Sequence, residues 1–221
     1  MALIVITGGN RGIGRELARL YAEGGDRVVL GVRKPEAAGS LPGTALPLDV
    51  GDDGSAAAFA GLLEGEPIDV LINNAGVIGP DRQSALDADF AGFLDTLNVN
   101  TLGPLRVTQA LLPNLRKAAG AKVAIVSSQM GSMSYAKSDH VAYRASKAAV
   151  NKVAQCLATD LAEEGIAVAA LHPGWVRTDM GGPGADIAPE ESAAGLKAVI
   201  DRLSPETTGR FWNYDGASLA W

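Results

Sequence analysis

The sequence has few of the residues that form disulfide bonds or bind metals. Its 221 residues include one cysteine, Cys156, and two histidines, His140 and His172. A single cysteine excludes an intramolecular disulfide framework and favours a reducing compartment. The two histidines lie far apart in the sequence and near no cysteine or carboxylate cluster, so we expect no metal site. Because Cys156 falls within a helical apolar pattern, we expect it to pack as a small hydrophobe.

Long apolar runs and basic clusters are also missing. No apolar run approaches the roughly 18 residues of a membrane span. Met1 leads through a short apolar run directly into Thr7-Gly8-Gly9, so we expect no secretory leader. The net charge is −6, and no run of basic residues exceeds the pair Arg33-Lys34. We therefore expect a cytoplasmic protein that binds neither membranes nor nucleic acid.

The alternation of apolar runs with helical patterns predicts the fold. We expect strands near 2–7, 28–30, 44–48, 68–72, 122–127, 166–171 and 209–213, and helices after the glycine turn at 8–14 and near 54–63, 86–98, 101–118, 142–164 and 189–203. Continuous apolar runs between helices are typical of parallel strands that are buried on both faces. The pattern predicts an α/β fold, a Rossmann-like doubly wound parallel sheet of about seven strands. The length of the chain fits one domain, residues 1–221, and 47% of its residues are apolar.

The turn after the first strand predicts a site for a dinucleotide pyrophosphate. Residues 7–14 read Thr-Gly-Gly-Asn-Arg-Gly-Ile-Gly and lead directly into the first helix. Glycines let the backbone approach phosphates, and a helix N-terminus offers unpaired N–H groups. The spacing departs from G-x-G-x-x-G, and the absence of a following Gly-Lys-Ser/Thr excludes a P-loop. Taken alone, the turn is also compatible with a simple tight connection.

A tyrosine and a lysine lie four residues apart at the start of the clearest helical pattern. This spacing places Tyr143 and Lys147 on one face of the helix, within reach of a shared ligand. A nearby positive charge favours the phenolate and brings the tyrosine pKa, near 10 in isolation, toward the range of proton transfer. Taken alone, Tyr-x-x-x-Lys is more often an ordinary exposed pair on a helix.

Further short motifs accompany these two in a fixed order along the chain. They are Asp49-Val50, Asn73-Asn74-Ala75-Gly76, Asn100, Ser127-Ser128 and Pro173-Gly174 followed by Thr178. From residue 3 to the C-terminus, the set resembles the short-chain dehydrogenase/reductase superfamily. The glycine turn, the segment 143–151 and the ending 214–221 are most similar to its carbonyl-reductase-like group, which includes sniffer and C-factor proteins.

The resemblance implies four catalytic residues, Asn100, Ser128, Tyr143 and Lys147. Tyr143 would protonate the carbonyl oxygen as hydride arrives, and Ser128 would donate a hydrogen bond to the same oxygen. Lys147 would lower the pKa of Tyr143 and bind the nicotinamide ribose, and Asn100 would hold a water that links Lys147 to solvent. For Asn100 the alternative is a helix-interior residue bonded to the backbone, with a bend there. The fifteen positions from Ser128 to Tyr143 predict a slightly extended loop.

The resemblance also implies a nicotinamide cofactor along the carboxyl edge of the sheet. The residues expected to bind it are Thr7, Gly8, Asn10, Arg11, Gly12, Ile13, Gly14, Arg33, Asp49, Val50, Asn74, Ala75, Gly76, Tyr143, Lys147, Pro173, Gly174, Val176 and Thr178. NAD-preferring members place an acid at the end of the second strand, where this chain has Val32. Arg33 follows it, and Arg11 can approach the same 2′-phosphate. The charges favour NADP(H) over NAD(H), which stays a possible second cofactor.

These observations leave two functions from different classes. The first is an NADP(H)-dependent oxidoreductase that interconverts a carbonyl compound and an alcohol, with Tyr143 as acid and base. The second is a cofactor-binding signalling or regulatory protein with little turnover. The intact set of four catalytic residues favours the enzyme, since a sensor does not need proton transfer. Epimerases and dehydratases of this superfamily typically have longer chains with an added substrate domain.

The sequence also bears on the substrate and on self-association. Apolar residues near the expected cleft favour a hydrophobic small-molecule substrate; they are Met130, Met133, Trp175 and Met180. The composition of 179–189 is that of a mobile lid. We expect a homodimer that pairs the helices 101–118 and 142–164 across a two-fold axis, where small residues allow close approach: Ala145, Ala148, Ala149 and Ala158.

Overall fold

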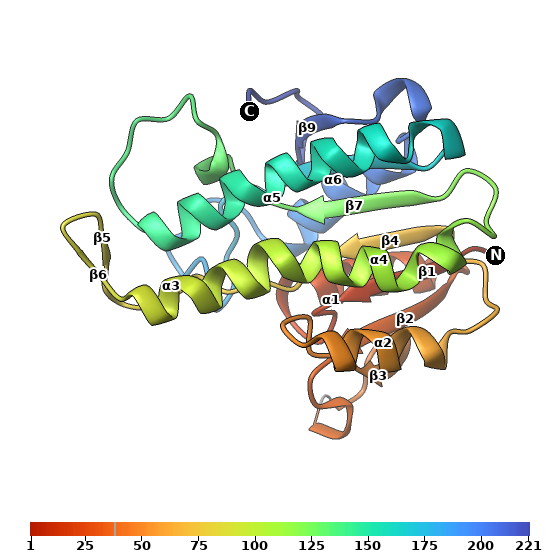
Figure 1. The fold of residues 1–221 in the computed structure, drawn as a ribbon. Helices are drawn as coiled ribbons and strands as arrows, with labels where there is room; N and C mark the ends of the chain where they lie inside the picture. The colour runs from red at the N-terminus through yellow and green to blue at the C-terminus, as the bar shows by residue number, and fades with distance from the viewer. Residues whose placement is uncertain (38) are drawn as a thin grey trace.

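The computed structural model describes residues 1–37 and 39–221, and its centre is a parallel sheet of seven strands (Figure 1). The strands are β1 (Leu3–Thr7), β2 (Arg27–Val32), β3 (Thr44–Pro47), β4 (Val70–Asn73), β7 (Lys122–Val126), β8 (Ala167–His172) and β9 (Arg210–Asn213), in the order β3-β2-β1-β4-β7-β8-β9. All neighbouring pairs are parallel. The strand order reverses between β1 and β4, which is where doubly wound sheets form their binding crevice. The predicted fold class is therefore confirmed.

Helices cover both faces of this sheet (Figure 1). They are α1 (Gly12–Glu23) and α6 (Pro189–Asp201) on one face, and α2 (Asp53–Leu62), α4 (Gly103–Leu115) and α5 (Val141–Asp160) on the other. Alternate residues of a strand point to opposite faces, so Ile4 and Ile6 pack with Leu17 of α1, whereas Val5 belongs to the core under α4 and α5. Burial on both faces explains why the strands are continuous apolar runs.

The segment that we expected to be a helix from residue 86 differs from the prediction. It begins with a two-stranded hairpin, β5 (Gln83–Ser84) and β6 (Asp87–Ala88), and α3 (Phe90–Leu97) follows. The Asp89 carboxylate caps α3 by accepting a hydrogen bond from the Gly92 N–H at 3.1 Å. A π-helical turn, Asn98–Leu102, then joins α3 to α4 in one continuous rod. The helical pattern was correct for 90–97, but the polar hairpin before it gave no strand signal.

Two residues of α5 lie differently from their sequence-based expectations. Cys156 is exposed, so the prediction that it packs as a small hydrophobe is wrong. Ala158 is buried in the core against the sheet, so it does not contribute to a surface for a second helix. The helix ends at Asp160, four residues earlier than expected, and a 3-10 turn, Ala162–Glu164, leads to Gly165 in the left-handed region at φ 69°.

The residues that the structure describes, 1–37 and 39–221, include no helix that is both long and apolar enough to cross a membrane. The same residues contain no group of three or more histidine, cysteine or acidic side chains placed to hold a metal ion.

The core under α4 and α5 provides a test of the packing. Leu111 of α4 is fully buried, so Leu111→Ala should lower the free energy of unfolding by about 2 to 5 kcal/mol through lost burial and the cavity left behind. The matched control is Leu86→Ala, because Leu86 is 98% exposed and its truncation should change stability by less than about 0.5 kcal/mol. Urea denaturation of both variants measures the difference, and equal losses would show that the packing is wrong.

Candidate active site

The residues expected at the site gather at the carboxyl edge of the sheet. Thr7 ends β1, Asn73 ends β4 and leads into Asn74, and Ser128 follows β7 by two residues. His172 ends β8 and leads into Pro173. Because the strands are parallel and adjacent, these ends form one row, with α5 packed alongside β8. The sequence motifs, far apart in the chain, therefore meet along one edge.

The glycine turn is bound to the segment after β4 by a small hydrogen-bond network. The Thr7 hydroxyl accepts from the backbone N–H groups of Asn74 and Ala75, each at 3.0 Å. The Asn74 amide in turn donates to the backbone oxygens of Thr7 at 3.0 Å and Gly8 at 3.1 Å. Thr7 and Asn74 thus fix the two backbone segments to each other, and this uses the polar groups that we had expected to bind the cofactor.

The turn itself leaves space that only glycine can leave. Gly8 and Gly12 have φ angles of 67° and 51°, in the left-handed region. A Cβ on Gly14 would lie 2.5 Å from both the Gly8 oxygen and the Asn74 amide nitrogen. The start of α1 has no side-chain cap and no acidic residue in its first turn, so its N–H groups are free to bind an anion. These features fit the pyrophosphate of a dinucleotide.

The loop after β8 lies against this turn. A Cβ on Gly12 would be 3.2 Å from the Thr178 Cγ2 methyl, so Thr178 is placed across the turn as expected for a cofactor residue. Val176 is buried and pairs with Ile187 in an isolated bridge that closes the base of the loop. Trp175 Nε1 donates to the Gly181 oxygen at 2.9 Å. The segment expected to be a mobile lid is therefore tied by its own hydrogen bonds.

The residues expected around the adenosine differ in whether their charged groups already have a partner in the protein. Arg33 is exposed just beyond β2, and in the part of the chain that the structure describes no carboxylate forms an ion pair with it. Arg11 forms an ion pair with Asp179 at 3.0 Å, so its guanidinium contacts the loop after β8. One oxygen of Asp49 accepts from the Gly51 N–H at 2.9 Å, which leaves the other oxygen for a ligand. Val50 is buried beside it, and Asn10 and Ile13 lie at the glycine turn.

Tyr143 and Lys147 are both buried in the first two turns of α5, rather than exposed as an ordinary helix pair would be. The Lys147 Nζ lies 5.6 Å from the centroid of the Tyr143 ring and donates to the Val126 oxygen at 2.8 Å. Ser128 begins a 3-10 turn, where its hydroxyl accepts from the Met130 N–H at 3.1 Å. Gly131 allows this turn to pack on α5, since a Cβ there would lie 2.5 Å from the Lys147 carbonyl carbon.

Burial shifts the two proton-transfer groups in opposite directions. It raises the pKa of Tyr143 to about 12, and contact with the Ser128 hydroxyl lowers that pKa by a smaller amount. Burial lowers the pKa of Lys147 to about 8. We had expected the pKa of Tyr143 to fall because of Lys147, but without cofactor desolvation has the largest effect and the net direction is upward.

Asn100 lies in the π-helical turn and is almost fully buried. Its side-chain oxygen accepts from the Val77 N–H, and its amide donates to the Val77 oxygen, both at 2.8 Å. The same amide donates to the Ser146 hydroxyl at 3.0 Å. Asn100 is bonded to the backbone, as the alternative for this residue proposed, but that backbone belongs to the segment after β4. The structure has a π-helical turn at the place of the proposed bend.

Sequence reasoning missed two buried residues that bind the backbone of Tyr143. Ser146 lies inside the Tyr143-to-Lys147 motif, and its hydroxyl donates to the backbone carbonyl oxygen of Tyr143 at 2.8 Å. Gln83, in β5, accepts from the Tyr143 N–H at 3.1 Å. The position of Ser146 on the inner face of the helix was readable from its spacing. Nothing near Gln83 in the sequence marks it, because its partner is the backbone of a residue 60 positions away.

A cavity of about 250 Å³ lies beside the site, between the ends of β8 and β9 and the turn after β7. Its polar lining residues are Gln129, His172, Asp186, Asn213 and Tyr214. His172 is largely buried, which lowers its pKa to about 4, and its Nδ1 has no hydrogen-bond partner. Of the apolar residues that we expected at the cleft, Trp175, Met133 and Met180 are all exposed, and of these three Trp175 lines this cavity.

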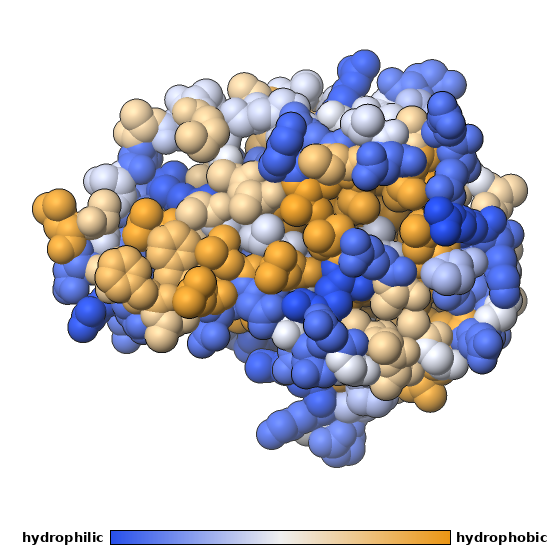
Figure 2. Space-filling view, viewed as in Figure 1, coloured by the Kyte–Doolittle hydropathy of each residue, from blue (hydrophilic) through white to orange (hydrophobic). Residues whose placement is uncertain are grey.

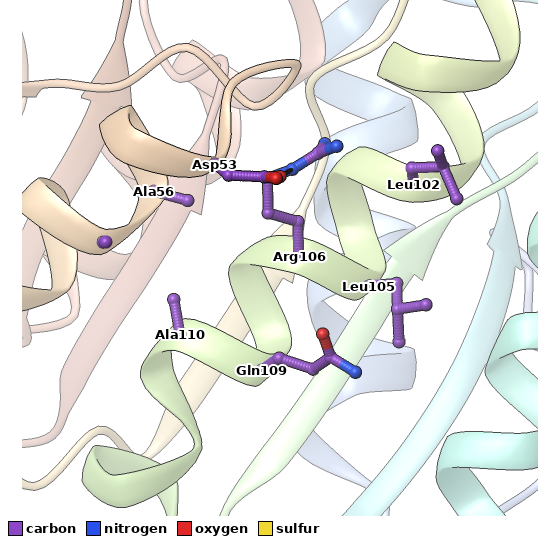
Figure 3. Close-up of a pocket in the computed structure, with 8 residues that line it drawn as sticks. Asp53, Ala56, Leu102, Leu105, Arg106, Gln109 and Ala110 are labelled. Carbon is purple, nitrogen blue, oxygen red and sulfur yellow. Dashed lines mark hydrogen bonds and ion pairs between the residues drawn. The ribbon is translucent and has the colours of Figure 1, made fainter.

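A larger cavity, about 390 Å³, lies on the outer surface between α2 and α4 (Figure 3). The Arg106 side chain points toward Asp53 across it and forms an ion pair with that carboxylate. Arg106 also donates to the Val50 oxygen at 2.6 Å. None of the residues that line this cavity is among those expected to be catalytic, so we place the chemistry at the sheet edge.

Comparison with known proteins agrees with this geometry. A family model described as short chain dehydrogenase matches residues 2–186. The C-signal protein of Myxococcus xanthus is 50% identical over 167 residues, covering 74% of this chain and 99% of that protein. The 1-hydroxy-2-glutathionyl-2-methyl-3-butene dehydrogenase of Rhodococcus sp. is 36% identical over the full length of both chains.

Solved structures extend the similarity over the whole chain. The NADPH-bound carbonyl reductase from chicken fatty liver has a TM-score of 0.91 at 31% identity, with both chains fully covered. The carbonyl reductase Sniffer of D. melanogaster has a TM-score of 0.90, also at 31% identity and full coverage. The matched residues include the glycine turn and α5, which carry the site described above. The chain belongs to the short-chain dehydrogenase family, in agreement with the sequence motifs and the fold.

Proposed function

We propose that this chain is an NADP(H)-dependent oxidoreductase that interconverts a small carbonyl compound and an alcohol by hydride transfer. One observation carries the proposal: Tyr143, Lys147 and Ser128 are buried together at the sheet edge that also holds the glycine turn. The whole chain, residues 1–221, acts as one dinucleotide-binding catalytic domain. The bound cofactor supplies the hydride, and the side chains at the sheet edge donate the proton and stabilise the negative charge on the carbonyl oxygen.

Each catalytic side chain has a role that its environment supports. With its pKa raised to about 12, Tyr143 holds its proton at neutral pH and can donate it to a carbonyl oxygen that gains negative charge. With its pKa lowered to about 8, Lys147 remains mostly charged at pH 7, and it binds the nicotinamide ribose. Ser128 donates to the same carbonyl oxygen. Asn100 keeps the segment after β4 in place beside Lys147.

The preference for NADP(H) follows from the charges at the end of β2. Val32 stands where an acid would select NAD, and the exposed Arg33 is free to pair with a 2′-phosphate. The carbonyl reductase from chicken fatty liver is NADPH-bound, and a structurally similar short-chain dehydrogenase from Burkholderia multivorans has bound NADP. Both relatives support the assignment. Arg11 pairs with Asp179 at the surface, so a 2′-phosphate would compete with that carboxylate for the Arg11 guanidinium.

The substrate class that we propose is a small carbonyl compound or alcohol with an apolar body. Trp175 provides an apolar surface at the mouth of the 250 Å³ cavity beside the site. The amides of Gln129 and Asn213 also line this cavity, so the substrate carries a hydrogen-bonding group in addition to the reacting one. The exposed thiol of Cys156 favours a reducing compartment, and we propose a cytoplasmic location on that ground.

The similarity to C-signal supports a second candidate function, a cofactor-binding signalling or regulatory protein with little turnover. The buried Tyr143 and Lys147 favour the enzyme, because a sensor has no need to desolvate a proton donor. A panel of aldehydes, ketones and quinones, assayed with NADPH and NADH, separates the two functions. Turnover at rates typical of enzymes would support the first, whereas cofactor binding without turnover of any panel member would support the second.

We also propose a homodimer, for which we expected the helices 101–118 and 142–164 to pair across the two-fold axis; the exposed apolar residues favour instead an interface along the rod of α3, the π-helical turn and α4. Figure 2 shows apolar side chains gathered along this rod, and the exposed ones include Phe90, Leu94 and Leu102, which we call the rod face. Exposed apolar patches of this kind are typical of interaction sites. A two-fold axis would set the rod against its own copy, so that the same residues cover each other. A second copy of this chain is therefore the partner that we propose.

Removal of the phenol tests the proton donor. Tyr143→Phe deletes one oxygen and almost no contact area, so turnover should be nearly abolished while NADPH still binds. Lys147→Met should impair both turnover and NADPH binding, because Lys147 contacts the ribose. Steady-state rates and cofactor fluorescence titration measure the two effects. A Tyr143→Phe protein that keeps more than about a tenth of the rate, a loss below about 1.4 kcal/mol in the barrier, would show that Tyr143 is not the acid.

Charge reversal at Arg33 tests the cofactor assignment. Arg33→Asp should weaken NADPH binding about ten- to hundredfold, because a charge-assisted hydrogen bond is replaced by repulsion, and NADH binding should change little. Lys34→Asp is the matched control at the next, also exposed, position. Titration of each cofactor gives the dissociation constants. Equal weakening of NADPH and NADH by Arg33→Asp, or a wild-type preference for NADH, would contradict the role of Arg33.

Light scattering tests the dimer. The chain has a mass of 22.7 kDa, and at micromolar concentration we expect about twice that value. Leu102→Glu should shift the protein to the monomer, because it places a charge within the rod face. Leu62→Glu, at an exposed apolar position of α2, should leave the mass unchanged. A wild-type protein that scatters as a monomer would exclude the dimer at that concentration.

A further inference from the structure

Gln83 is a buried amide that connects two backbone segments of the site. It belongs to the hairpin strand β5, and only 7% of its surface is exposed. Its Nε2 donates to the Ile78 oxygen at 3.0 Å, and its Oε1 accepts from the Tyr143 N–H at 3.1 Å. Gly79 provides the space for it, since a Cβ there would lie 3.1 Å from the Gln83 Oε1. Gln83 therefore joins the segment after β4 to the start of α5.

The start of α5 lacks the usual side-chain cap. His140 precedes the helix in the left-handed region, at φ 51° and ψ 49°, and its side chain makes no capping hydrogen bond. The first four N–H groups of a helix have no partner within the helix, and the N–H of Tyr143 is the third of them. Without Gln83 this N–H would be buried and unpaired, which is costly. A residue from outside the helix thus caps the turn that carries Tyr143.

The carbonyl of Tyr143 is connected to the same segment by a second route. It accepts from the Ser146 hydroxyl at 2.8 Å, and that hydroxyl accepts from the Asn100 amide at 3.0 Å. Asn100 binds both backbone groups of Val77. The N–H of Tyr143 is therefore linked to Ile78, and its carbonyl is linked to the neighbouring residue Val77. Two separate hydrogen-bond chains therefore join the backbone of one residue, through its N–H and its carbonyl, to one short segment.

We propose that Gln83 is a positioning residue that, together with Ser146, fixes the backbone of Tyr143 to the segment 74–78. We call this arrangement the Tyr143 clamp. The inference rests on the proposed function, in which residues 74–76 lie along the cofactor and Tyr143 transfers the proton. The clamp sets the distance between the phenol and the cofactor, and misplacement of a reacting group by about 1 Å can cost about 100-fold in rate. Gln83 acts through Tyr143 and does not touch the substrate.

Two substitutions at Gln83 and one elsewhere test the clamp. Gln83→Met has nearly the same size but neither hydrogen bond, and kcat should fall about tenfold or more while KM and NADPH affinity stay within about twofold. Gln83→Glu can replace the amide only when protonated, because its carboxyl then both accepts and donates. Its kcat should approach the wild-type value near about pH 5 and fall relative to wild type as the carboxylate forms. The control is Gln155→Met, since among residues 1–37 and 39–221 the Gln155 side chain has one hydrogen bond, which its Oε1 accepts from the exposed Lys152 at 3.2 Å.

Amide hydrogen exchange gives a readout that does not need turnover. The N–H of Tyr143 should be protected in the wild-type protein and exchange at least about tenfold faster in Gln83→Met, whereas Gln83→Glu should keep it protected at any pH, because a carboxylate and a carboxylic acid both accept its hydrogen bond. If exchange of the Tyr143 N–H follows this pattern in the wild-type protein and the two variants, but the wild-type protein reduces no carbonyl compound, the proposed function is refuted and the clamp still holds. The clamp is wrong if Gln83→Met keeps kcat within about twofold of wild type, if kcat and NADPH affinity fall equally, or if Gln83→Glu shows no recovery at low pH.

Discussion

The rest of the site depends on the hydrogen bonds between the Thr7 hydroxyl and the backbone that follows β4. By accepting from the N–H groups of Asn74 and Ala75, Thr7 fixes the glycine turn to the neighbouring strand end. β1 and β4 are the adjacent strands between which the strand order reverses, which is where doubly wound sheets form their crevice. Asn100 and Gln83 then connect the continuation of this segment to Tyr143. One chain of contacts thus runs from the glycine turn to Tyr143.

Burial explains the electrostatic state of the site. The same desolvation raises the pKa of Tyr143 and lowers that of Lys147, so it disfavours the charged form of each, although Lys147 with a pKa of about 8 is still mostly charged at pH 7. For the tyrosine, this favours the protonated phenol that carbonyl reduction requires. The reverse reaction needs the phenolate, which in turn needs a positive charge nearby, and Lys147 is the buried cation available on the same helix. The proposed chemistry therefore needs Lys147 to remain charged in spite of its burial.

The fold could be predicted from the sequence because both faces of the sheet are buried. Each long strand is then an apolar run, and each helix between them shows one apolar stripe. The hairpin at 83–88 was missed because its strands have only two residues each, too few to show an alternating pattern. The π-helical turn was missed because one extra residue in a helical turn barely changes the spacing of the apolar residues along the helix. Cys156 was placed wrongly for a related reason, since it lies next to the stripe and on the exposed side.

The site was predictable only where its chemistry depends on residue type at fixed spacing. Tyr143 and Lys147 share one helix, so their relation is local, and the glycine turn is continuous in sequence. The contacts of Gln83 and Asn100 are different in kind, because each binds backbone groups, which every residue possesses. A backbone partner leaves no signature in the sequence. Such contacts become visible only when the topology brings the segments together.

The geometry of Asn100 limits how it can take part in proton transfer. Both N–H donors of its amide and its side-chain oxygen are already engaged, by Val77 and Ser146. Its two amide donors are therefore committed to structure, and a water beside Lys147 can bind Asn100 only through an oxygen atom, in its side chain or in its main chain. A π-helical turn shifts the pairing of backbone groups by one residue and can leave a carbonyl without its usual partner. The π-helical turn at Asn98–Leu102 thus contains the residue whose side chain binds Val77, so one segment carries both the altered backbone pairing and the contact with the segment after β4.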